Sequence, residues 1–243
     1  DFNLGFQYKL PWLERTAQLR THAPYSTGTV AISVGSTTLT GTDSLWNTTN
    51  SYGEANARTT GKLVFEGTTD IYPITTVTSD TAIALTNKYV GSAALSGATY
   101  TYFEDTYDLA SDFLRPMDFQ FFSQARNIQL IPRDEFRRRF PRPNVAGNPE
   151  YACLLDLAPT GSTSPIRRVQ FYPYPSTTLI IPYTYVTNAV GVSSAGSALT
   201  SLSSDTDEPL IPLRYRHAIV YHALYHWYRD KRDDARSQEA KAE

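Results

Sequence analysis

The sequence has few residues that could form covalent or metal-held crosslinks. Its 243 residues include 1 Cys, 1 Met and 4 His. A disulfide needs two thiols and a zinc site needs several ligands, so Cys153 alone can support neither framework. Cys153 lies in the apolar run of residues 151–155, and free cysteines of this kind are usually buried. We therefore expect a buried, unreactive thiol at this position.

Long apolar runs and charged residues are also scarce. No window approaches the roughly 18 uninterrupted apolar residues that a membrane-spanning helix requires, so we expect no membrane partner. Charged residues make up 19% of the chain, and the formal net charge is -2. This balance argues against a simple electrostatic attraction of the whole chain to nucleic acid.

Aromatic residues, by contrast, are abundant. They make up 13% of the chain and include 17 Tyr. A tyrosine combines a large apolar ring with a polar hydroxyl, which suits surfaces that become buried on association. The composition therefore indicates a protein that interacts with partners, without identifying them.

The segment 25–105 is predicted to be all β. Thr, Val and Gly dominate it, which disfavours helix, and its short alternating stretches are separated by Gly, Asn and Asp turns. The candidate strands are residues 29–34, 37–40, 62–65, 70–77, 81–86 and 98–103. Strands of this length and spacing predict a small antiparallel β-barrel or sandwich.

Two helices are predicted outside this segment. In residues 131–140 a proline precedes two acidic residues and then several basic ones, which is the order that a short helix favours. Residues 213–240 carry an apolar stripe at helical spacing, followed by mixed charges, so we expect a long helix that is packed in its first half and projects in its second. Residues 188–208, rich in Ser, Gly and Ala, are expected to form a flexible loop. The other expected strands are residues 151–157, 168–173 and 178–186.

No motif in the sequence supplies a catalytic or metal-binding set. His222 and His226 stand four residues apart, a spacing that can hold zinc, but Ala223 occupies the place where a metalloprotease helix carries its glutamate. No third ligand is evident, so we interpret the histidines as hydrogen-bonded neighbours and expect no metal. A nucleophilic-serine motif and a phosphate-binding glycine loop are also missing. We interpret the adjacent carboxylates at 104–105 and 233–234 as solvated, and expect neither an enzyme nor a cofactor.

One local excess of positive charge is the basic cluster, which consists of Arg133, Arg137, Arg138, Arg139 and Arg142. Arginine makes bidentate contacts with phosphate or carboxylate. The basic cluster could therefore line a channel for DNA or meet an acidic partner. The alternative is a solvated helix face that pairs with nearby acidic residues and with neighbouring subunits, because charge runs are more often surface than site.

Two stretches resemble a known family of phage proteins. The first comprises residues 24–31, 35–42 and Trp46, with Tyr72-Pro73-Ile74 and Tyr89-Val90-Gly91. The second is residues 222–236, which read HALYHWYRDKRDDAR. In this order they resemble the β module and the closing helix of tailed-phage head-to-tail adaptors, or connectors. This group includes the tail tubular protein A of short-tailed phages.

The resemblance implies an α+β fold. A small antiparallel β-barrel or sandwich module (25–105) would be inserted in a helical adaptor core (1–24 plus 106–243) with additional β-strands and a long C-terminal helix (213–240). It also implies a structural virion protein at the neck of the phage, assembled in the host cytoplasm. The expected partners are copies of the chain in a dodecameric ring, the portal protein, and a tail or nozzle protein. Double-stranded DNA would pass through the lumen without sequence specificity.

The resemblance also suggests site residues. Those expected to contact the portal or a neighbouring subunit are Tyr225, Trp227, Tyr228, Arg229, Arg232 and Arg236. Those expected to face the DNA channel are Arg137, Arg138 and Arg139. Two other functions stay open. One is a carbohydrate-binding or adhesin-like module of a phage tail fibre, whose aromatic residues in 25–105 would stack on sugars. The other is a zinc hydrolase that uses His222 and His226.

Overall fold

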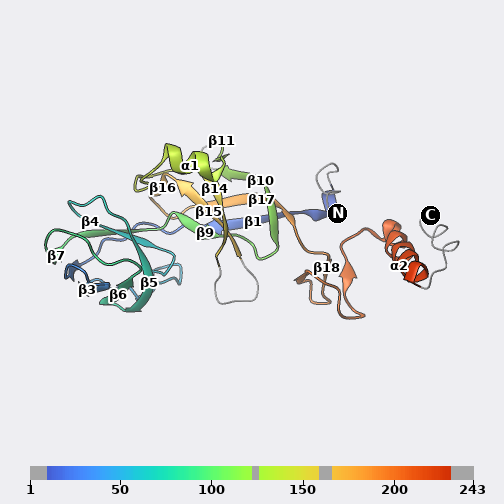
Figure 1. The fold of residues 1–243 in the computed structure, drawn as a ribbon, viewed down its shortest axis with the longest axis horizontal. Coiled ribbons are helices and arrows are strands. Elements are labelled where there is room, and N and C mark those ends of the chain that lie inside the picture. Colours follow the sequence, from blue (N-terminus) through green and yellow to red (C-terminus); the bar gives the residue numbers. More distant parts are fainter. Residues whose placement is uncertain (1–9, 122–125, 159–165, 231–243) are drawn as a thin grey trace. The chain divides into compact units, whose positions relative to one another are not determined.

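The computed structural model describes residues 10–121, 126–158 and 166–230, and Figure 1 shows their elements along the chain. Strands hold 42% of these residues and helices 13%. The described residues contain two α-helices, α1 (Arg133–Arg139) and α2 (His217–Asp230). The predicted α+β fold with a helical adaptor core is therefore wrong. The segments assigned to that core are rich in Tyr, Phe, Val and Ile, which favour strands.

The chain divides into two compact units. The larger unit contains Thr16–Ser111 and Pro116–Thr184, and the smaller contains Asp1–Arg15, Asp112–Arg115 and Tyr185–Glu243. Among the residues that the structure describes, neither unit has a helix that is both long and apolar enough to span a membrane.

A seven-stranded antiparallel sheet forms one part of the larger unit, in the order β7-β2-β3-β6-β5-β4-β8. Its strands are β2 (Thr29–Ile32), β3 (Thr38–Thr42), β4 (Lys62–Phe65), β5 (Tyr72–Ser79), β6 (Ala82–Leu85), β7 (Leu95–Ala98) and β8 (Tyr100–Phe103). Only Thr99 separates β7 from β8, so one short stretch of chain pairs with β2 at one end of the sheet and with β4 at the other. The sheet therefore curls into a small barrel, within the segment where short antiparallel strands are predicted.

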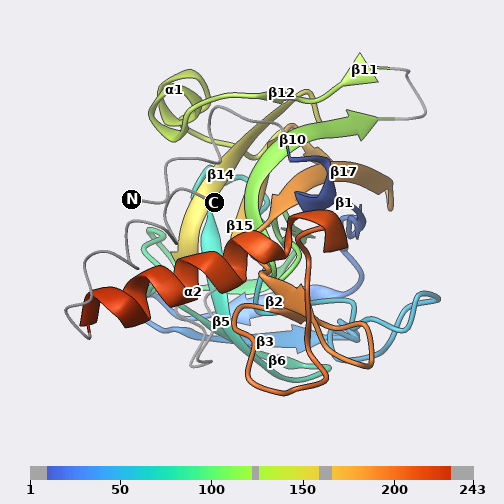
Figure 2. The same cartoon turned by 90° about the vertical axis from the view of Figure 1, so that its right-hand side faces the viewer.

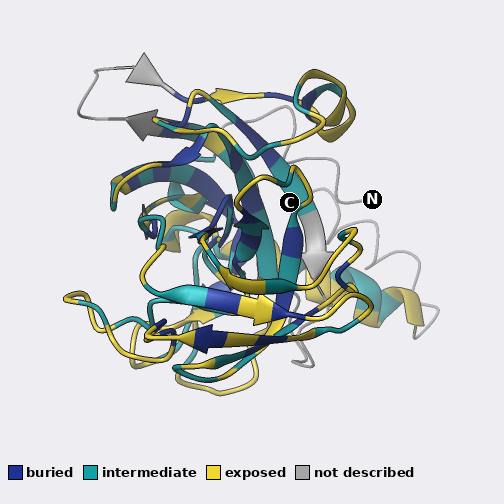
Figure 3. Cartoon of the chain, turned by 90° about the vertical axis from the view of Figure 1, so that its left-hand side faces the viewer, coloured by how far each residue is buried: buried dark blue, intermediate teal, exposed yellow. Residues whose placement is uncertain are grey.

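Alternating side chains explain why these strands form. In β4 and β6 every second residue is buried, and Figure 3 shows buried and exposed residues alternating along the strands of this sheet. The period of two places one face of each strand inside the barrel. Trp46 lies in this core, where its indole N–H donates to the Tyr100 hydroxyl (2.8 Å), which in turn donates to the carbonyl of Thr27 (2.6 Å).

A second sheet of the larger unit has the order β12-β14-β15-β9. Its strands are β12 (Gln129–Leu130), β14 (Tyr151–Ala158), β15 (Ile166–Tyr172) and β9 (Thr106–Asp108). The predicted short helix in 131–140 is confirmed as α1, which packs on β14. Phe136 of α1 and Ile131 enclose Cys153, which is fully buried as predicted. A short parallel pair, β13 (Ala146–Gly147) and β16 (Tyr174–Pro175), accompanies this sheet.

A third sheet has the order β1-β17-β10-β11. Its strands are β1 (Glu14–Arg20), β17 (Ile180–Thr187), β10 (Phe113–Phe121) and β11 (Arg126–Asn127). β1 follows a short 3-10 turn at Pro11–Leu13. In β1 alternate side chains are partly or fully buried, although Leu19 is the only large apolar residue among its seven.

Among the described residues, the smaller unit contains α2 and three strands that lie wholly within it. The strands are β18 (Gly191–Val192), β19 (Ala198–Leu199) and β20 (Glu208–Pro209), in the order β19-β18-β20. The predicted flexible loop at 188–208 is therefore wrong, because backbone pairing between short strands organises it. A 3-10 turn at Leu213–Tyr215 precedes α2, and the rest of the predicted helix (231–240) lies outside the described residues.

α2 does not pack as predicted. None of its residues is buried, although the first half of the helix was expected to be. Figure 2 shows the helix side-on. Its apolar side chains include Val220, Leu224 and Trp227, which are 57%, 36% and 55% exposed.

Candidate functional site

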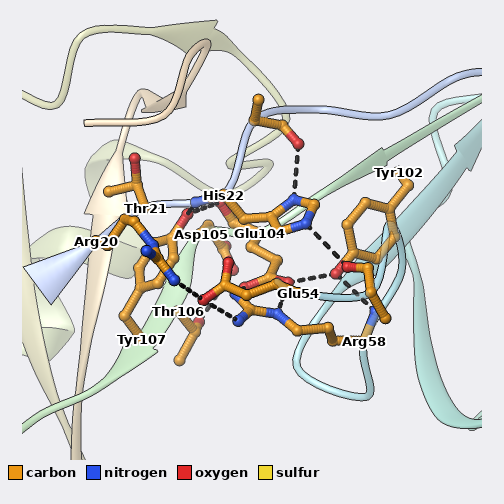
Figure 4. A network of polar contacts seen from close by, with 12 residues as sticks. Arg20, Thr21, His22, Glu54, Arg58, Tyr102, Glu104, Asp105, Thr106 and Tyr107 are labelled. Carbon is orange, nitrogen blue, oxygen red and sulfur yellow. Dashed lines mark hydrogen bonds and ion pairs between the residues drawn. The ribbon is translucent and has the colours of Figure 1, made fainter. Parts of the chain in front are cut away.

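Glu104 and Asp105, between β8 and β9, form the centre of a buried ion network. Their exposures are 1% and 0%, so the interpretation of this pair as solvated is wrong. A buried carboxylate is stable only when cations and hydrogen-bond donors replace its water. Figure 4 shows that side chains from several segments converge on the pair.

Glu104 binds the guanidinium of Arg58 in a bidentate manner. Arg58 Nε donates to Oε1 (2.8 Å) and Nη2 donates to Oε2 (2.6 Å). Burial would lower the pKa of Arg58, but the hydrogen bonds and charge of Glu104 outweigh it and raise the pKa. The Tyr102 hydroxyl also donates to Glu104. Burial, together with the neighbouring Glu104 charge, raises the pKa of Tyr102 well above its ordinary value.

Asp105 holds two residues that belong to different sheets. Its Oδ2 accepts hydrogen bonds from Lys62 Nζ and from Gln170 Nε2, both at 2.7 Å. Its Oδ1 accepts one from the Thr106 hydroxyl (2.9 Å). Lys62 comes from β4 of the barrel and Gln170 from β15. The carboxylate therefore connects the barrel sheet to the β12-β14-β15-β9 sheet.

Lys62 and Gln170 also line a pocket of about 630 Å³ between β4, β15 and α1, here called the basic pocket. Its cationic lining residues are Lys62, Arg133, Arg137 and Arg168. Its polar uncharged lining residues are Thr59, Thr60, Thr106 and Gln170. No Asp or Glu lines it among the residues that the structure describes. The basic pocket is therefore suited to an anion and not to a cation.

The cations of the basic pocket have different partners. Arg168 Nε donates to Asp108 (2.8 Å), whose side chain is 46% exposed, and Lys62 is paired with buried Asp105. Arg137 has no ion pair with any described residue. The lining of the basic pocket itself thus carries four cations and, among the described residues, no carboxylate.

The three predicted DNA-channel residues lie in different surroundings. Arg137 lines the basic pocket, whereas Arg138 and Arg139 do not. Arg139 forms an i,i+4 ion pair with Glu135. The exposed side chain of Arg138 has no ion pair among the described residues. The basic cluster in the sequence includes two of the pocket's cations, Arg133 and Arg137. Lys62 and Arg168 are far from that cluster in the chain, so the sequence did not indicate that they line the same pocket.

The predicted portal-binding residues lie on α2, except for Arg232 and Arg236, which fall outside the described residues. Trp227 is 55% exposed, and Tyr225 and Tyr228 are half-buried. The guanidinium of Arg229 lies 5.7 Å from the centre of the Tyr225 ring. The side chains of α2 thus present aromatic and cationic groups together.

His222 and His226 contact each other through their Nε2 atoms, 3.1 Å apart. Among the described residues, no group of three or more His, Cys, Asp or Glu side chains could hold a metal ion. The geometry is that of two hydrogen-bonded imidazoles, and it brings no further ligand to them.

The barrel aromatics, on which the sugar-binding alternative depends, lie mostly inside. Trp46, Tyr72, Tyr89, Tyr100 and Tyr102 are each at most 3% exposed. Their ring faces are therefore occupied by the core of the barrel and are not presented to a ligand.

Comparison with known proteins identifies no relative: no protein-family model, no curated protein and no solved structure matches the chain.

Proposed function

We propose that this chain is a structural assembly protein, a head-to-tail adaptor that joins copies of itself into a ring between the portal and the tail of a phage. In this proposal α2 is the helix that docks on the portal or on a neighbouring subunit. The observation that carries it is the exposed apolar stripe of α2, which has no buried residue.

The spacing of this stripe supports a docking role. Val220, Leu224 and Trp227 stand at i, i+4 and i+7, so they lie on one face of the helix. Helices of this length are marginal in isolation and draw most of their stability from packing of an apolar face. Full burial of one such side chain contributes about 1.5–3 kcal/mol. A partner that covers the stripe would therefore stabilise both the helix and the complex.

The surroundings of the stripe also suit an interface. Tryptophan, tyrosine and arginine are the residue types that most often dominate binding energy, and α2 places Trp227 near Tyr225, Tyr228 and Arg229. The identity of the partner comes from the resemblance of residues 222–236 to the closing helix of adaptors. The proposal does not depend on a helical core.

A matched pair of valine variants tests the role of α2. Val220 and Val90 are both exposed, at 57% and 71%, but Val90 lies in the barrel segment. Val220→Asp places a charge in the proposed interface, and we expect it to weaken binding of the portal protein from the same phage at least about tenfold. Val90→Asp should bind like the wild type. The measurement is sedimentation velocity of the full chain titrated with portal rings.

Equal binding of wild type and Val220→Asp would remove α2 from the interface. Equal weakening by both variants would show that the added charge acts without regard to position, and it would contradict the assignment as well.

A further inference from the structure

We infer that the basic pocket is a binding site for a phosphate-type oxyanion. This inference does not rest on the adaptor proposal, because it concerns the larger unit and uses none of the residues of α2. The chemistry is that of a tetrahedral, multiply charged group with several acceptor oxygens, supplied by free phosphate or by a phosphodiester.

The charge distribution is the first argument. Four cations and, among the described residues, no carboxylate line the basic pocket. The carboxylates that pair with Lys62 and Arg168 lie outside this lining. Asp105 is buried beneath Lys62, and Asp108 is bound to Arg168. Arg133 and Arg137 stand one helical turn apart on α1 and both face the pocket. An anion in the basic pocket would therefore lie beside cations from both α1 and the sheets.

The available donors are the second argument. Each guanidinium offers a planar fork of N–H groups that matches phosphate oxygens. The ammonium of Lys62 has three donors, of which Asp105 accepts one. Thr60 Oγ1 is buried and has no hydrogen-bond partner among the described residues. Such groups are uncommon in folded proteins, and a bound oxyanion would give this hydroxyl an acceptor after a rotation about χ1.

The lining is also held in place before any ligand arrives. Asp105 fixes Lys62 and Gln170. Phe136, 2% exposed, anchors α1 in the apolar cluster around Cys153 and thereby orients the arginines on the outer side of the helix. Preorganised groups lose less entropy on binding, which favours affinity for a small ligand.

The aromatic lining argues against recognition of a nucleobase. Phe140 lines the basic pocket, but its ring is stacked on Tyr172 with centroids 3.8 Å apart and an interplanar angle of 17°. It also contacts Tyr151 (5.2 Å) and Phe136 (5.3 Å). The ring of Phe140 already packs against other aromatic rings of the protein, so it is not available to stack on a base. The site should therefore recognise the oxyanion and not a base.

The test is the binding of inorganic phosphate to the full chain, measured as the rise of Tm with phosphate concentration against chloride at equal ionic strength. We expect saturable stabilisation of the wild type. Arg137→Gln should raise the Kd at least about tenfold. Arg138→Gln, an exposed arginine of the same helix that does not line the basic pocket, should leave the Kd within about twofold. Thr60→Val, which preserves the side-chain shape, should raise it about fivefold.

Competition between phosphate and a DNA duplex identifies the source of the oxyanion. A short DNA duplex that displaces phosphate from the wild type, and that binds Arg137→Gln less well, would identify a phosphodiester backbone. A duplex that does not displace phosphate would identify a free phosphate or phosphate monoester. Both outcomes support the site.

Three results would overturn the proposal. The first is a wild type that phosphate stabilises no more than chloride does. The second is equal loss of binding in Arg137→Gln and Arg138→Gln. The third is tight binding of a polyglutamate peptide without any binding of phosphate, which would assign the pocket to an acidic protein segment. The Tm of each variant in chloride alone reports whether it is folded.

Discussion

At the scale of single residues, the adjacent carboxylates of Glu104 and Asp105 connect segments that are far apart in the sequence. One carboxylate binds Arg58 within the barrel region, and the other joins β4 to β15 through Lys62 and Gln170. The sequence could not reveal this role, because the partners lie 43 to 65 residues away along the chain. The burial of Cys153, in contrast, was predictable because its own neighbours in sequence are apolar.

Removal of the Asp105 carboxylate should be strongly destabilising. Asp105→Ala leaves the ammonium of Lys62, 21% exposed, without its counter-charge, and it leaves the Gln170 amide without its acceptor. Breaking a buried ion pair on one side costs about 3–5 kcal/mol. Urea denaturation monitored by fluorescence measures the change in unfolding free energy.

Asp108→Ala is the matched control. Asp108 forms an ion pair of similar length with Arg168 (2.8 Å), but its side chain is 46% exposed. Solvent screens such a pair, so its loss should change the unfolding free energy by about 0–1 kcal/mol. Equal losses for the two variants would show that burial is not what gives the Asp105 pair its importance.

Glu54 should make stability depend on pH in the acid range. Burial raises its pKa, but the hydrogen bond from Arg20 and the charges of Arg58 and Arg20 outweigh burial and hold the pKa below the ordinary value of 4.5. A carboxyl whose folded-state pKa is depressed stabilises the fold above its unfolded-state pKa. That contribution is lost as the pH falls through the folded-state pKa.

The comparison of wild type with Glu54→Gln isolates this effect. The difference in unfolding free energy between them should be constant above about pH 5 and should shrink as the pH is lowered below the ordinary carboxyl value. A difference that grows on acidification would mean that the pKa of Glu54 is raised in the folded state.

At the scale of elements, the local sequence pattern was informative where burial alternates strictly. β4 and β6 bury every second residue. α1 begins after Pro132 and carries acidic residues in its first turn and basic residues in its last. β1 was not predicted, because its seven residues include a single large apolar side chain and therefore show no apolar alternation. The strands in 191–209 were not predicted either, because two-residue strands depend on backbone pairing and are too short to show a side-chain pattern.

The connection between the barrel and the ion network depends on a glycine next to β4. A Cβ on Gly61 would lie 2.0 Å from the ring of Tyr102, whose hydroxyl accepts a hydrogen bond from Arg58 N (3.0 Å) and donates to Glu104. Gly61→Ala should displace this ring and destabilise the protein by about 1–3 kcal/mol, as overpacking does.

Gly147→Ala provides the comparison, because its Cβ would approach only Pro173, at 3.2 Å. We expect this variant to lower the free energy of unfolding by less than about 1 kcal/mol. Thermal unfolding of both proteins measures the difference. A Gly61→Ala protein as stable as Gly147→Ala would mean that Tyr102 can move without cost.

At the scale of the whole molecule, the described residues are mostly β, and the amphipathic helix α2 is exposed. The helical core was expected from the resemblance alone, and its two diagnostic stretches cover a β segment and α2, not the residues between them. The described residues between these stretches form mostly strands, together with the short helix α1. The basic pocket could not be predicted for another reason: its cations come from residue 62, α1 and residue 168, which only the fold brings together.

The proposed docking of this chain on a portal ring through α2 is tested most directly by negative-stain electron microscopy of the full chain mixed with the portal protein encoded by the same genome. We expect a second ring stacked on the portal, present with the wild type and with Val90→Asp, and absent with Val220→Asp. Portal rings without added density at concentrations well above micromolar would contradict the proposed function. A stacked ring that forms equally well with Val220→Asp would contradict the role of α2.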